Sequence, residues 1–446
     1  MNVTTLIPDG TGLVDWPTLS TVKKSVVTVG GFDGMHRGHL AVVKRTVALA
    51  QSHRAYSVVV MFDPRPALVH GYAATHDGED PAPGTRDPDA LTSVHQRLRI
   101  MHELGVDHVL VVHYTLAFAA KSFRFFLGQL VGKLGMRTLV LGSDAAMGAN
   151  RTGDIAAIRN LSEATGVFEL SVVEDLGPGY VRVPAVITPR VPDRAGEPQD
   201  PTAQMTKAEL RAWSKEHQGR KTRVWSSSYV RYLLSQGRIH DANEVLGSRH
   251  AIEGLVVHGE GLGRTLGFPT ANLGDDIDGY IPVDGVYAGW LVDLGERNHD
   301  ASGSEATSTP TQANGETVGF SSATSPSDEI RMAAHSPWRW PAAISIGTKP
   351  TYDDGNGANQ RVIEPYAITK DWLELYGHTV RVEFSGFLSP QIAFPDSEAL
   401  KRAMGGWSDK TLALVAGNEA KDEAKDEAKD EAKDEAKDEA KDESAR

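Results

Sequence analysis

The sequence predicts a doubly wound α/β domain with a parallel sheet, followed by a small antiparallel β-barrel, or a sandwich of the same strands, with a C-terminal helix. Between residues 25 and 175, short β-branched runs alternate with helical patterns, which is typical of parallel strands joined by crossover helices. From residue 252 onward the runs are short, β-rich and separated by turns. With 446 residues and 40% hydrophobic content, the chain is long enough for two or three packed domains.

Each element is predicted from its local pattern. Parallel strands are expected at Val26–Val29, Tyr56–Phe62, His108–His113, Thr138–Leu141 and Val167–Val173. Crossover helices are expected at His39–Gln51, Leu91–Leu104, Ser122–Leu134 and Ile155–Thr165, and two closing helices at Ser226–Gly237 and His240–Leu246. Antiparallel strands are expected at Ile252–Val257, Gly285–Val292, Ala342–Ile346, Val362–Ile368 and Val380–Phe384, and a terminal helix begins at Ser397–Ala403.

Changes in composition divide the chain into segments. We expect the α/β domain at 1–184, an inserted loop or helix at 185–222, the closing helices at 223–247 and the barrel domain at 248–416. Within the barrel domain, residues 295–336 contain so few apolar side chains that we expect a disordered insert. Residues 417–446 form a charged repeat tail, which is either a solvated, marginal helix or disordered.

Composition argues against several classes of function. The chain has no cysteine, which excludes disulfides and thiolate chemistry. Its formal net charge of −13 argues against a general nucleic-acid binder, although the Lys-Asp-Glu-Ala repeats of the tail carry much of that charge. The sequence shows no basic leader followed by an apolar stretch, and no uninterrupted apolar run with a length of about 18 residues. Export and membrane insertion are therefore not expected, and a cytoplasmic location is.

The most informative stretch of the barrel domain is Gly267-Phe268-Pro269-Thr270-Ala271-Asn272, which follows Gly259, Gly261 and Gly263. Glycines let backbone amides approach a phosphate closely. Pro269 would break a helix that such a turn could open, so a dinucleotide-binding fold is not indicated. Thr270 and Asn272 remain as hard oxygen donors, a combination that suits a nucleotide with bound Mg²⁺. The alternative is a hairpin that is merely rich in turn residues.

A second informative stretch, Gly30-Gly31-Phe32-Asp33-Gly34-Met35-His36-Arg37-Gly38-His39, joins a predicted strand to a predicted helix. Two imidazoles three residues apart at a helix N-terminus can donate to phosphate oxygens together with free backbone amides. Such a site catalyses by positioning the reactants and stabilising charge, without a covalent nucleophile. A metal site and a purely structural histidine pair are the alternatives.

This second stretch resembles the His-x-Gly-His motif of the nucleotidyltransferase superfamily, and its flanking Gly-Phe-Asp-Gly is similar to the FAD synthetase branch. Phe62-Asp63-Pro64-Arg65-Pro66, Gly142-Ser143-Asp144 and Ser226-Ser227-Ser228-Tyr229-Val230-Arg231 resemble further motifs of that branch in the same order. The serine run could equally be a helix N-cap, and both roles can hold together. The resemblance implies catalytic roles for His36 and His39. It implies ATP binding by Gly30, Phe32, Asp33, Gly38, Ser226, Ser227, Ser228 and Arg231, and flavin binding by Phe62, Pro64, Pro66 and Asp144.

The chain departs from this branch at three positions. The family usually has asparagine at position 31 and aromatic residues near 145 and 147, where this sequence has Gly31, Ala145 and Met147. Loss of those aromatic rings removes flavin-facing surface. ATP binding is therefore better supported here than FMN binding.

The glycine-rich stretch of the barrel resembles the signature of riboflavin kinases, and Pro282, Gly285-Val286-Tyr287-Ala288, Ile346-Gly347 and Leu375-Tyr376-Gly377 continue that resemblance. It implies that Gly263, Gly267, Phe268 and Pro269 bind ATP, and that Thr270 and Asn272 hold Mg²⁺. Glu364 would be the general base that takes a proton from a primary alcohol. From the pattern alone, a single strand glutamate is more often a solvated surface residue.

Together these resemblances predict a bifunctional riboflavin kinase and FMN adenylyltransferase, with riboflavin, FMN, FAD and ATP as substrates and products and Mg²⁺ as cofactor. The N-terminal domain would be of nucleotidyltransferase type and the barrel would be the kinase. The alternatives are a riboflavin kinase with a decayed N-terminal domain, a non-catalytic flavin-binding or scaffold protein, and an adenylyltransferase with another acceptor. Neither nucleic acid nor membrane is an expected partner, and a homo-oligomer is left open.

Overall fold

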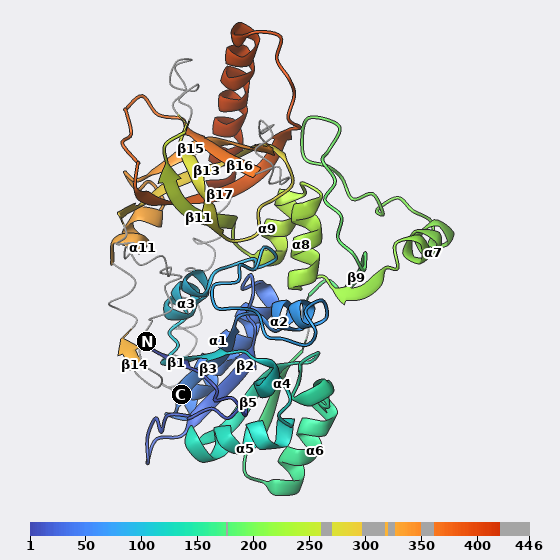
Figure 1. Cartoon of the computed structure of the whole chain (residues 1–446), viewed down its shortest axis with the longest axis vertical. Coiled ribbons are helices and arrows are strands. Elements are labelled where there is room, and N and C mark those ends of the chain that lie inside the picture. Colours follow the sequence, from blue (N-terminus) through green and yellow to red (C-terminus); the bar gives the residue numbers. More distant parts are fainter. Residues whose placement is uncertain (175–176, 260–269, 297–316, 320–325, 349–360, 420–446) are drawn as a thin grey trace, which may run out of the picture.

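The computed structural model describes residues 1–174, 177–259, 270–296, 317–319, 326–348 and 361–419. They form an N-terminal α/β domain and a C-terminal antiparallel barrel, which confirms the predicted fold class. Figure 1 shows the two domains stacked along the long axis of the molecule, with helices α8 and α9 between them. No helix in the described part of the chain combines the length and apolar character that crossing a bilayer requires.

The N-terminal sheet has 7 strands in the order β14-β1-β4-β3-β2-β5-β8. Its parallel strands are β1 (Asn2–Leu6), β2 (Ser25–Gly30), β3 (Tyr56–Asp63), β4 (His108–His113), β5 (Met136–Gly142) and β8 (Glu169–Val173). The order runs from β2 outward through β3 and β4 on one side and through β5 and β8 on the other. The chain therefore reverses direction across the sheet between β2 and β5, as in doubly wound folds.

Helices cover both faces of this sheet because successive strand residues point to opposite sides. On one face, α1 (Arg37–Ser52) and α3 (Val94–Glu103) pack against Val59 and Met61. On the other face, α5 (Phe123–Lys133) and α6 (Ile155–Thr165) pack against Val58 and Val60. Shorter elements lie in the connections between these strands and helices: α2 (Pro66–Ala73), α4 (Leu116–Ala119), β6 (Ala146–Met147), η1 (Ala149–Arg151) and β7 (Gly153–Asp154).

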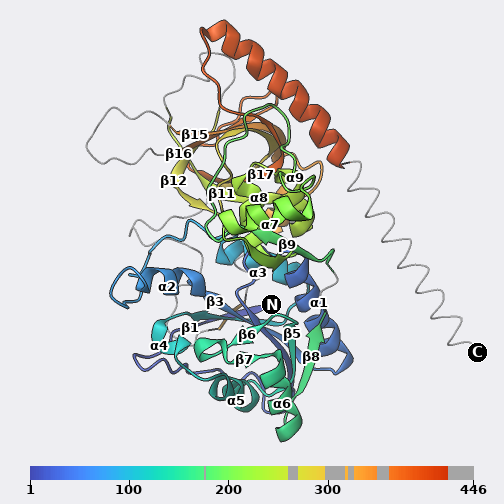
Figure 2. The same ribbon diagram turned by 90° about the vertical axis from the view of Figure 1, so that its right-hand side faces the viewer.

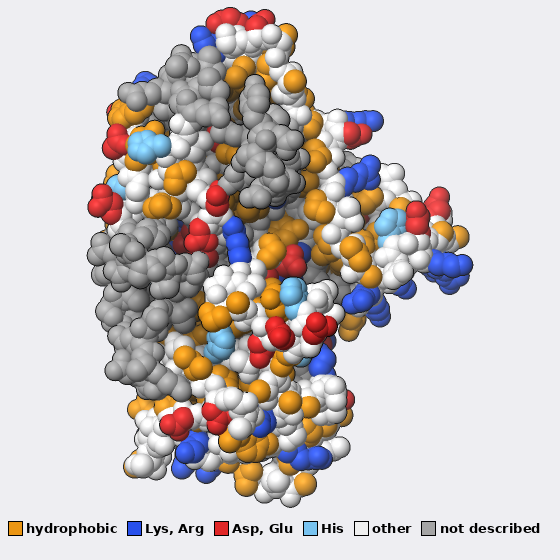
Figure 3. All heavy atoms as spheres, viewed as in Figure 1, with side chains coloured by type: hydrophobic (Ala, Val, Ile, Leu, Met, Phe, Trp, Pro, Cys, Tyr) orange, Lys and Arg blue, Asp and Glu red, His pale blue; other side chains and the backbone are white. Residues whose placement is uncertain are grey.

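Most of the predicted insertion 185–222 lies between two antiparallel strands, β9 (Tyr180–Val183) and β10 (Arg220–Arg223), and its last residues belong to β10. It contains α7 (Lys207–Glu216), which a Thr206–Glu209 capping box begins. Figures 1 and 3 show α7 projecting from the body, with charged side chains of both signs on the face in view. Another part of the insertion contacts α9 and the barrel, because Glu197 accepts backbone hydrogen bonds from His240 at 2.7 Å and Phe387 at 2.8 Å.

The closing helices, α8 (Ser227–Ser235) and α9 (Ile239–Leu246), share one apolar core with the barrel. The barrel sheet has 6 strands in the order β12-β11-β17-β13-β15-β16. These strands are β11 (His250–Val257), β12 (Asn272–Asp278), β13 (Gly285–Glu296), β15 (Arg339–Thr348), β16 (Arg361–Ala367) and β17 (His378–Ser389). A bridge between Thr270 and Tyr366 joins the two edges, so the sheet curls into a barrel.

The terminal helix is confirmed and covers 397–419 in the described chain. Its Trp407 and Leu414 pack on Val286, Ala288 and Leu388 of the barrel. Figure 2 shows the helix lying along the barrel. The repeat tail from residue 420 onward lies outside the described residues.

The predicted disordered insert at 295–336 lies partly outside the described residues, and its described residues include a short strand and a helix. Strand β14 (Thr317–Gly319) pairs antiparallel with β1, and α11 (Pro326–Met332) packs beside β13. Asp328 of α11 is buried and forms an ion pair with Arg99 of α3 at 3.3 Å, while Arg331 pairs with Asp293 at 2.8 Å. Polar composition predicted disorder, but ion pairs to distant parts of the chain hold this helix.

Candidate functional sites at the sheet switch point and on the barrel

A pocket of about 630 Å³ opens at the carboxyl ends of β2, β3 and β5, where the strand order reverses. Eleven of the predicted site residues line it: Gly30, Phe32, His36, Gly38, His39, Phe62, Pro66, Asp144, Ser226, Ser227 and Ser228. The three departures Gly31, Ala145 and Met147 line it as well. Segments almost 200 residues apart in sequence thus meet at one site.

The loop between β2 and α1 is held by buried apolar anchors and by positive backbone dihedrals. Phe32 (φ 50°) and Met35 (φ 41°) are buried in the core beneath α3. Gly34 has φ 79°, and its backbone N–H donates to Thr92 Oγ1 at 2.9 Å. A side chain at Gly38 would meet the His36 ring at 3.2 Å, which explains a glycine between the two histidines.

His36 and His39 form a stacked pair at the start of α1. Their ring centroids are 3.7 Å apart, and His36 is the N-cap whose Nδ1 accepts from the His39 backbone N–H at 3.4 Å. Burial lowers the pKa of His36 well below its usual value, and burial together with the Arg97 guanidinium lowers the pKa of His39 to about 3. Both rings are therefore neutral at pH 7. Because Nδ1 of His36 accepts, its proton lies on Nε2, where it can donate to a phosphate oxygen.

Asp33 and Arg231, both predicted to bind ATP, are paired with each other and are absent from the pocket lining. Asp33 Oδ1 also accepts from the backbone N–H groups of Leu91 and Thr92, at 2.8 and 3.2 Å. The Asp33 carbonyl accepts from Ser227 Oγ at 2.8 Å. These contacts fasten the β2–α1 loop to the start of α8, so in this structure both residues support the site from behind.

The serine run begins α8 and faces the pocket. Ser226 Oγ accepts from the Tyr229 backbone N–H at 3.3 Å as an N-cap and donates to the Arg223 carbonyl at 2.8 Å. Ser227 and Ser228 belong to the first turn of the same helix, and both line the pocket. The N-cap role and a pocket-facing helix N-terminus, which could bind an anion, are therefore combined.

Sequence reasoning missed an aromatic wall along one side of the pocket, formed with Phe62. Phe62, Tyr114 and Phe118 form a cluster with centroid separations of 5.4 to 5.9 Å, and all three line the pocket. Tyr114 directly follows β4, a position that also lies at the carboxyl end of the sheet and could have been found on that ground. The cationic residues Lys121, Arg151 and Arg223, which also line the pocket, were not among the predicted site residues.

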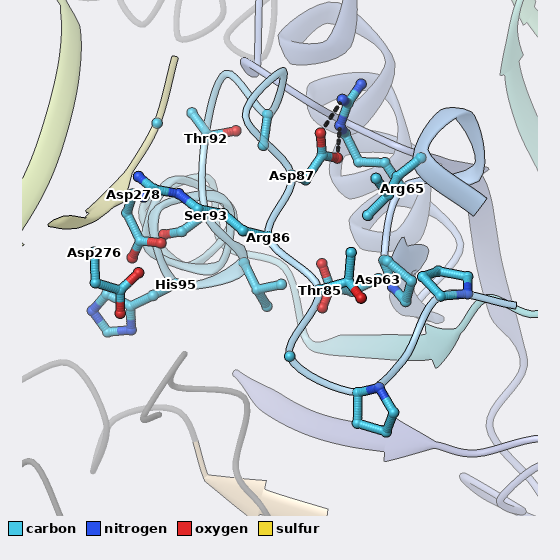
Figure 4. Close-up of a pocket in the computed structure, with 18 of the residues that line it drawn as sticks. Asp63, Arg65, Thr85, Arg86, Asp87, Thr92, Ser93, His95, Asp276 and Asp278 are labelled. Atoms are coloured by element: carbon cyan, nitrogen blue, oxygen red, sulfur yellow. Dashed lines mark hydrogen bonds and ion pairs between the residues drawn. The ribbon is translucent and has the colours of Figure 1, made fainter. Parts of the chain in front are cut away.

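Pro64, predicted to contact flavin, lines a different pocket of about 230 Å³ between the two domains. Figure 4 shows Arg65 and Asp87 on one side of it and Asp276 and Asp278 of β12 on the other. Arg65 binds Asp87 through two nitrogens, at 2.6 and 2.7 Å. The segment that follows β3 thus contributes to both pockets.

The barrel carries the second candidate site at the junction of β12 and β16. The bridge between Thr270 and Tyr366, together with the hydrogen bond from Ala271 N to Pro365 O at 3.0 Å, sets Asn272 opposite Glu364. Ile363 on β16 and Ala271 beside β12 point into the core, so Glu364 and Asn272 share the opposite face of the sheet.

The backbone at Gly259 passes close to the Asn272 side chain, which supports this arrangement. A side chain at Gly259 would meet the Asn272 amide at 2.3 Å, so glycine there lets the chain pass close to Asn272. Glu364 is half-buried and Asn272 is buried. The predicted ATP-binding residues Gly263, Gly267, Phe268 and Pro269 lie outside the described residues.

Comparison with known proteins gives two family matches. The FAD synthetase family model matches residues 19–185 and the riboflavin kinase family model matches residues 246–413. A bifunctional riboflavin kinase/FMN adenylyltransferase of Escherichia coli strain K12 is 30% identical over 275 residues, which cover 61% of this chain and 69% of that protein. A protein of the same name from Bacillus subtilis strain 168 is 28% identical over 265 residues, covering 59% and 66%.

A solved structure described as a macrolide-efflux protein from Streptococcus pneumoniae has the same fold. It superposes with a TM-score of 0.59 at 20% sequence identity and covers 92% of this chain and 98% of that one. At that identity the likeness supports the arrangement of the two domains and nothing about activity.

Proposed function

Because the chain belongs to the family of bifunctional riboflavin kinases/FMN adenylyltransferases, we propose how its own residues divide the two reactions of that family. The barrel domain phosphorylates riboflavin to FMN, and the α/β domain adenylylates FMN to FAD with release of pyrophosphate. We place both reactions in the cytoplasm and assign Mg²⁺ to both. One observation above all supports the assignment: most of the predicted residues of the FAD synthetase motifs line the switch-point pocket, while Thr270, Asn272 and Glu364 lie at a separate place on the barrel.

In the α/β domain, we assign the triphosphate to the loop between β2 and α1. Neutral His36 and His39 donate to phosphate oxygens, together with the backbone amides at the starts of α1 and α8. The FMN phosphate oxygen forms a bond to the α-phosphorus of ATP, and the bond from that phosphorus to the pyrophosphate breaks. The chain contributes by positioning and by stabilising charge on the departing pyrophosphate, with Lys121, Arg151 and Arg223 within the same pocket.

The aromatic wall favours an active FMN site over a decayed one. Ala145 and Met147 lack rings, but Phe62, Tyr114 and Phe118 present aromatic surface to the same pocket. An isoalloxazine ring can pack against such a surface. We therefore assign the flavin to this side and the adenine nucleotide to the histidine side.

In the barrel domain, we assign Glu364 as the general base. Its carboxylate takes the proton of the ribityl 5′-hydroxyl as that oxygen forms a bond to the γ-phosphorus, while the bond to ADP breaks. The hydroxyl of Thr270 and the amide oxygen of Asn272 are the hard donors that Mg²⁺ prefers, and they share a face with Glu364. Mg²⁺ bound there would neutralise charge on the triphosphate.

The first test is a time course. The full-length chain is incubated with riboflavin, ATP and Mg²⁺, and the flavins are separated by chromatography. The proposal predicts FMN first and FAD later. FMN without FAD would restrict the proposal to the barrel, and unchanged riboflavin from folded protein would refute the kinase assignment.

A further inference from the structure

Arg97 of α3 is a buried cation. It lies behind the switch-point pocket, to which we assign adenylyl transfer. Its side chain is among the largest that are fully buried, with 2% of the residue exposed. A guanidinium carries five N–H donors and never loses its charge, so burial at this depth requires several acceptors. The acceptors of Arg97 come from the ends of two different strands and from the start of its own helix.

These acceptors lie on both sides of the β2–β3 junction. Nη1 donates to the Gly31 carbonyl at 2.8 Å and to the Phe62 carbonyl at 3.4 Å. Nη2 donates to Asp63 Oδ1 at 3.4 Å, and Nε donates to the Ser93 carbonyl of its own helix at 3.3 Å. One rigid fork thus joins the end of β2, the end of β3 and the start of α3.

The joined backbone forms two walls of the pocket. Gly31 lies in the loop that leads to the histidine pair, and Phe62 begins the aromatic wall assigned to flavin. One guanidinium therefore bridges the histidine side and the flavin side just beyond Gly30 and Met61, the last residues paired between β2 and β3. On its far side, Arg97 lines the interdomain pocket beside Asp63 and His95, which Figure 4 labels.

The Arg97 guanidinium also influences the pKa values of two titratable groups beside it, Asp63 and His39. Burial raises the pKa of Asp63, and the Arg97 guanidinium opposes that rise. The same guanidinium helps to lower the pKa of His39. A neutral replacement would change both the spacing of the walls and the charge near the histidine pair.

We propose that Arg97 is a positioning residue for adenylyl transfer: it fixes the spacing of the Gly31 and Phe62 backbones, and with it the alignment of FMN with ATP. This inference rests on the proposed function of the α/β domain. A displacement of about 1 Å at a reacting group can cost about 100-fold in rate, so a lost fork is expected to act on kcat more than on KM.

The test compares the full-length variants Arg97→Met and Arg97→Lys with Arg99→Met. Arg99 is a matched control, because it is equally buried on the same helix but pairs with Glu253 and Asp328 toward the barrel. For each variant, kcat and KM are measured for FAD formation from supplied FMN. FMN formation from riboflavin and the melting temperature are measured on the same preparation.

We expect Arg97→Met to lower kcat for FAD formation by about 10- to 100-fold, with FMN formation within about twofold of wild type. Arg97→Lys, which keeps the charge but not the fork, should recover part of that loss, and Arg99→Met should lose thermal stability while keeping its kcat for FAD formation. If Arg97→Met does not fold, a reduced kcat in folded Arg97→Lys carries the test.

Three results would overturn the inference. Wild-type kcat for FAD formation in Arg97→Met would do so, as would equal loss of both activities in Arg97→Met and Arg99→Met. Wild-type kinetics in Arg97→Lys would also refute the role of the fork. A wild-type chain that makes no FAD from FMN would instead refute the proposed function itself, so the two failures can be told apart.

Discussion

His36 and His39 stack ring on ring, with their planes inclined by 22° and the His39 backbone N–H donating to His36. Because burial keeps both imidazoles neutral, the pair presents hydrogen-bond donors to the pocket and no fixed positive charge, as our proposal for phosphate binding requires. A pair of this kind is pre-arranged for a charge that develops only during reaction.

Replacing both His36 and His39 with alanine should lower FAD formation by about 100-fold or more, since two pre-arranged donors are lost. FMN formation should continue, because the barrel site is separate. Chromatography of both flavins measures the two rates together, and exposed His53→Ala is the control. Undiminished FAD synthesis would remove the pair from the mechanism.

Glu364→Gln should abolish FMN formation, because an amide cannot accept the hydroxyl proton, while FAD is still made from supplied FMN. Glu374→Gln, on an exposed turn, is the matched control. The two reactions are assayed separately, each with its own flavin substrate. Loss of both activities in folded Glu364→Gln would contradict two independent sites.

Removal of Mg²⁺ by a chelator should stop both reactions without lowering the thermal stability of the protein. The candidate donors Thr270 and Asn272 are both uncharged, so the chain alone should hold Mg²⁺ weakly and depend on the triphosphate for the remaining ligands. EDTA should therefore stop both reactions while leaving the melting temperature of the nucleotide-free protein unchanged. EDTA already saturated with Mg²⁺ is the control, and a large drop in melting temperature would indicate a resident metal.

Acid should destabilise the fold partly through His250. Burial lowers the pKa of His250 to about 4, while its Nε2 bonds to the Tyr280 carbonyl at 2.7 Å. The unfolded chain then binds more protons than the folded one between about pH 6.5 and 4, so stability falls as the pH falls through that range.

His250→Gln keeps a donor for Tyr280 but does not titrate. When the pH falls from 7.5 to 5, the unfolding free energy of this variant should fall by about 2 kcal/mol less than that of wild type. The figure follows from about 1.4 kcal/mol for each unit by which the pKa of His250 differs between the folded and unfolded chains. Urea unfolding at both pH values measures it, with His53→Gln alongside. The same pH dependence in His250→Gln and wild type would rule out this contribution.

Local periodicity predicted the main strands and helices of both domains, because their burial patterns repeat with the period of the element. It missed β1 and β14, which are short and pair with strands far away in the chain. It also missed α11, whose Asp328 meets Arg99 229 positions away. Contacts over such separations leave no local signal in the sequence.

The residues of the candidate site divide in the same way, into those with a local sequence signal and those that depend on long-range contacts. Residues at strand ends, such as His36 and Phe62, could be predicted because topology brings strand ends together. The pairing of Asp33 with Arg231 could not, since the two residues lie 198 positions apart and no local pattern links them. Tyr114 and Phe118 show that aromatic surface missing at one position can be supplied from another element.

The carboxylate of Glu197 has consequences for how this protein can be recombined. One oxygen binds the main chain of α9 and the other binds the main chain of β17, so a single side chain of the insertion links the closing helices to the barrel. A chimera that takes its barrel from a relative must present a main-chain donor in the place of Phe387, whatever its sequence. Exchange of domains is thus constrained by backbone geometry more than by residue identity.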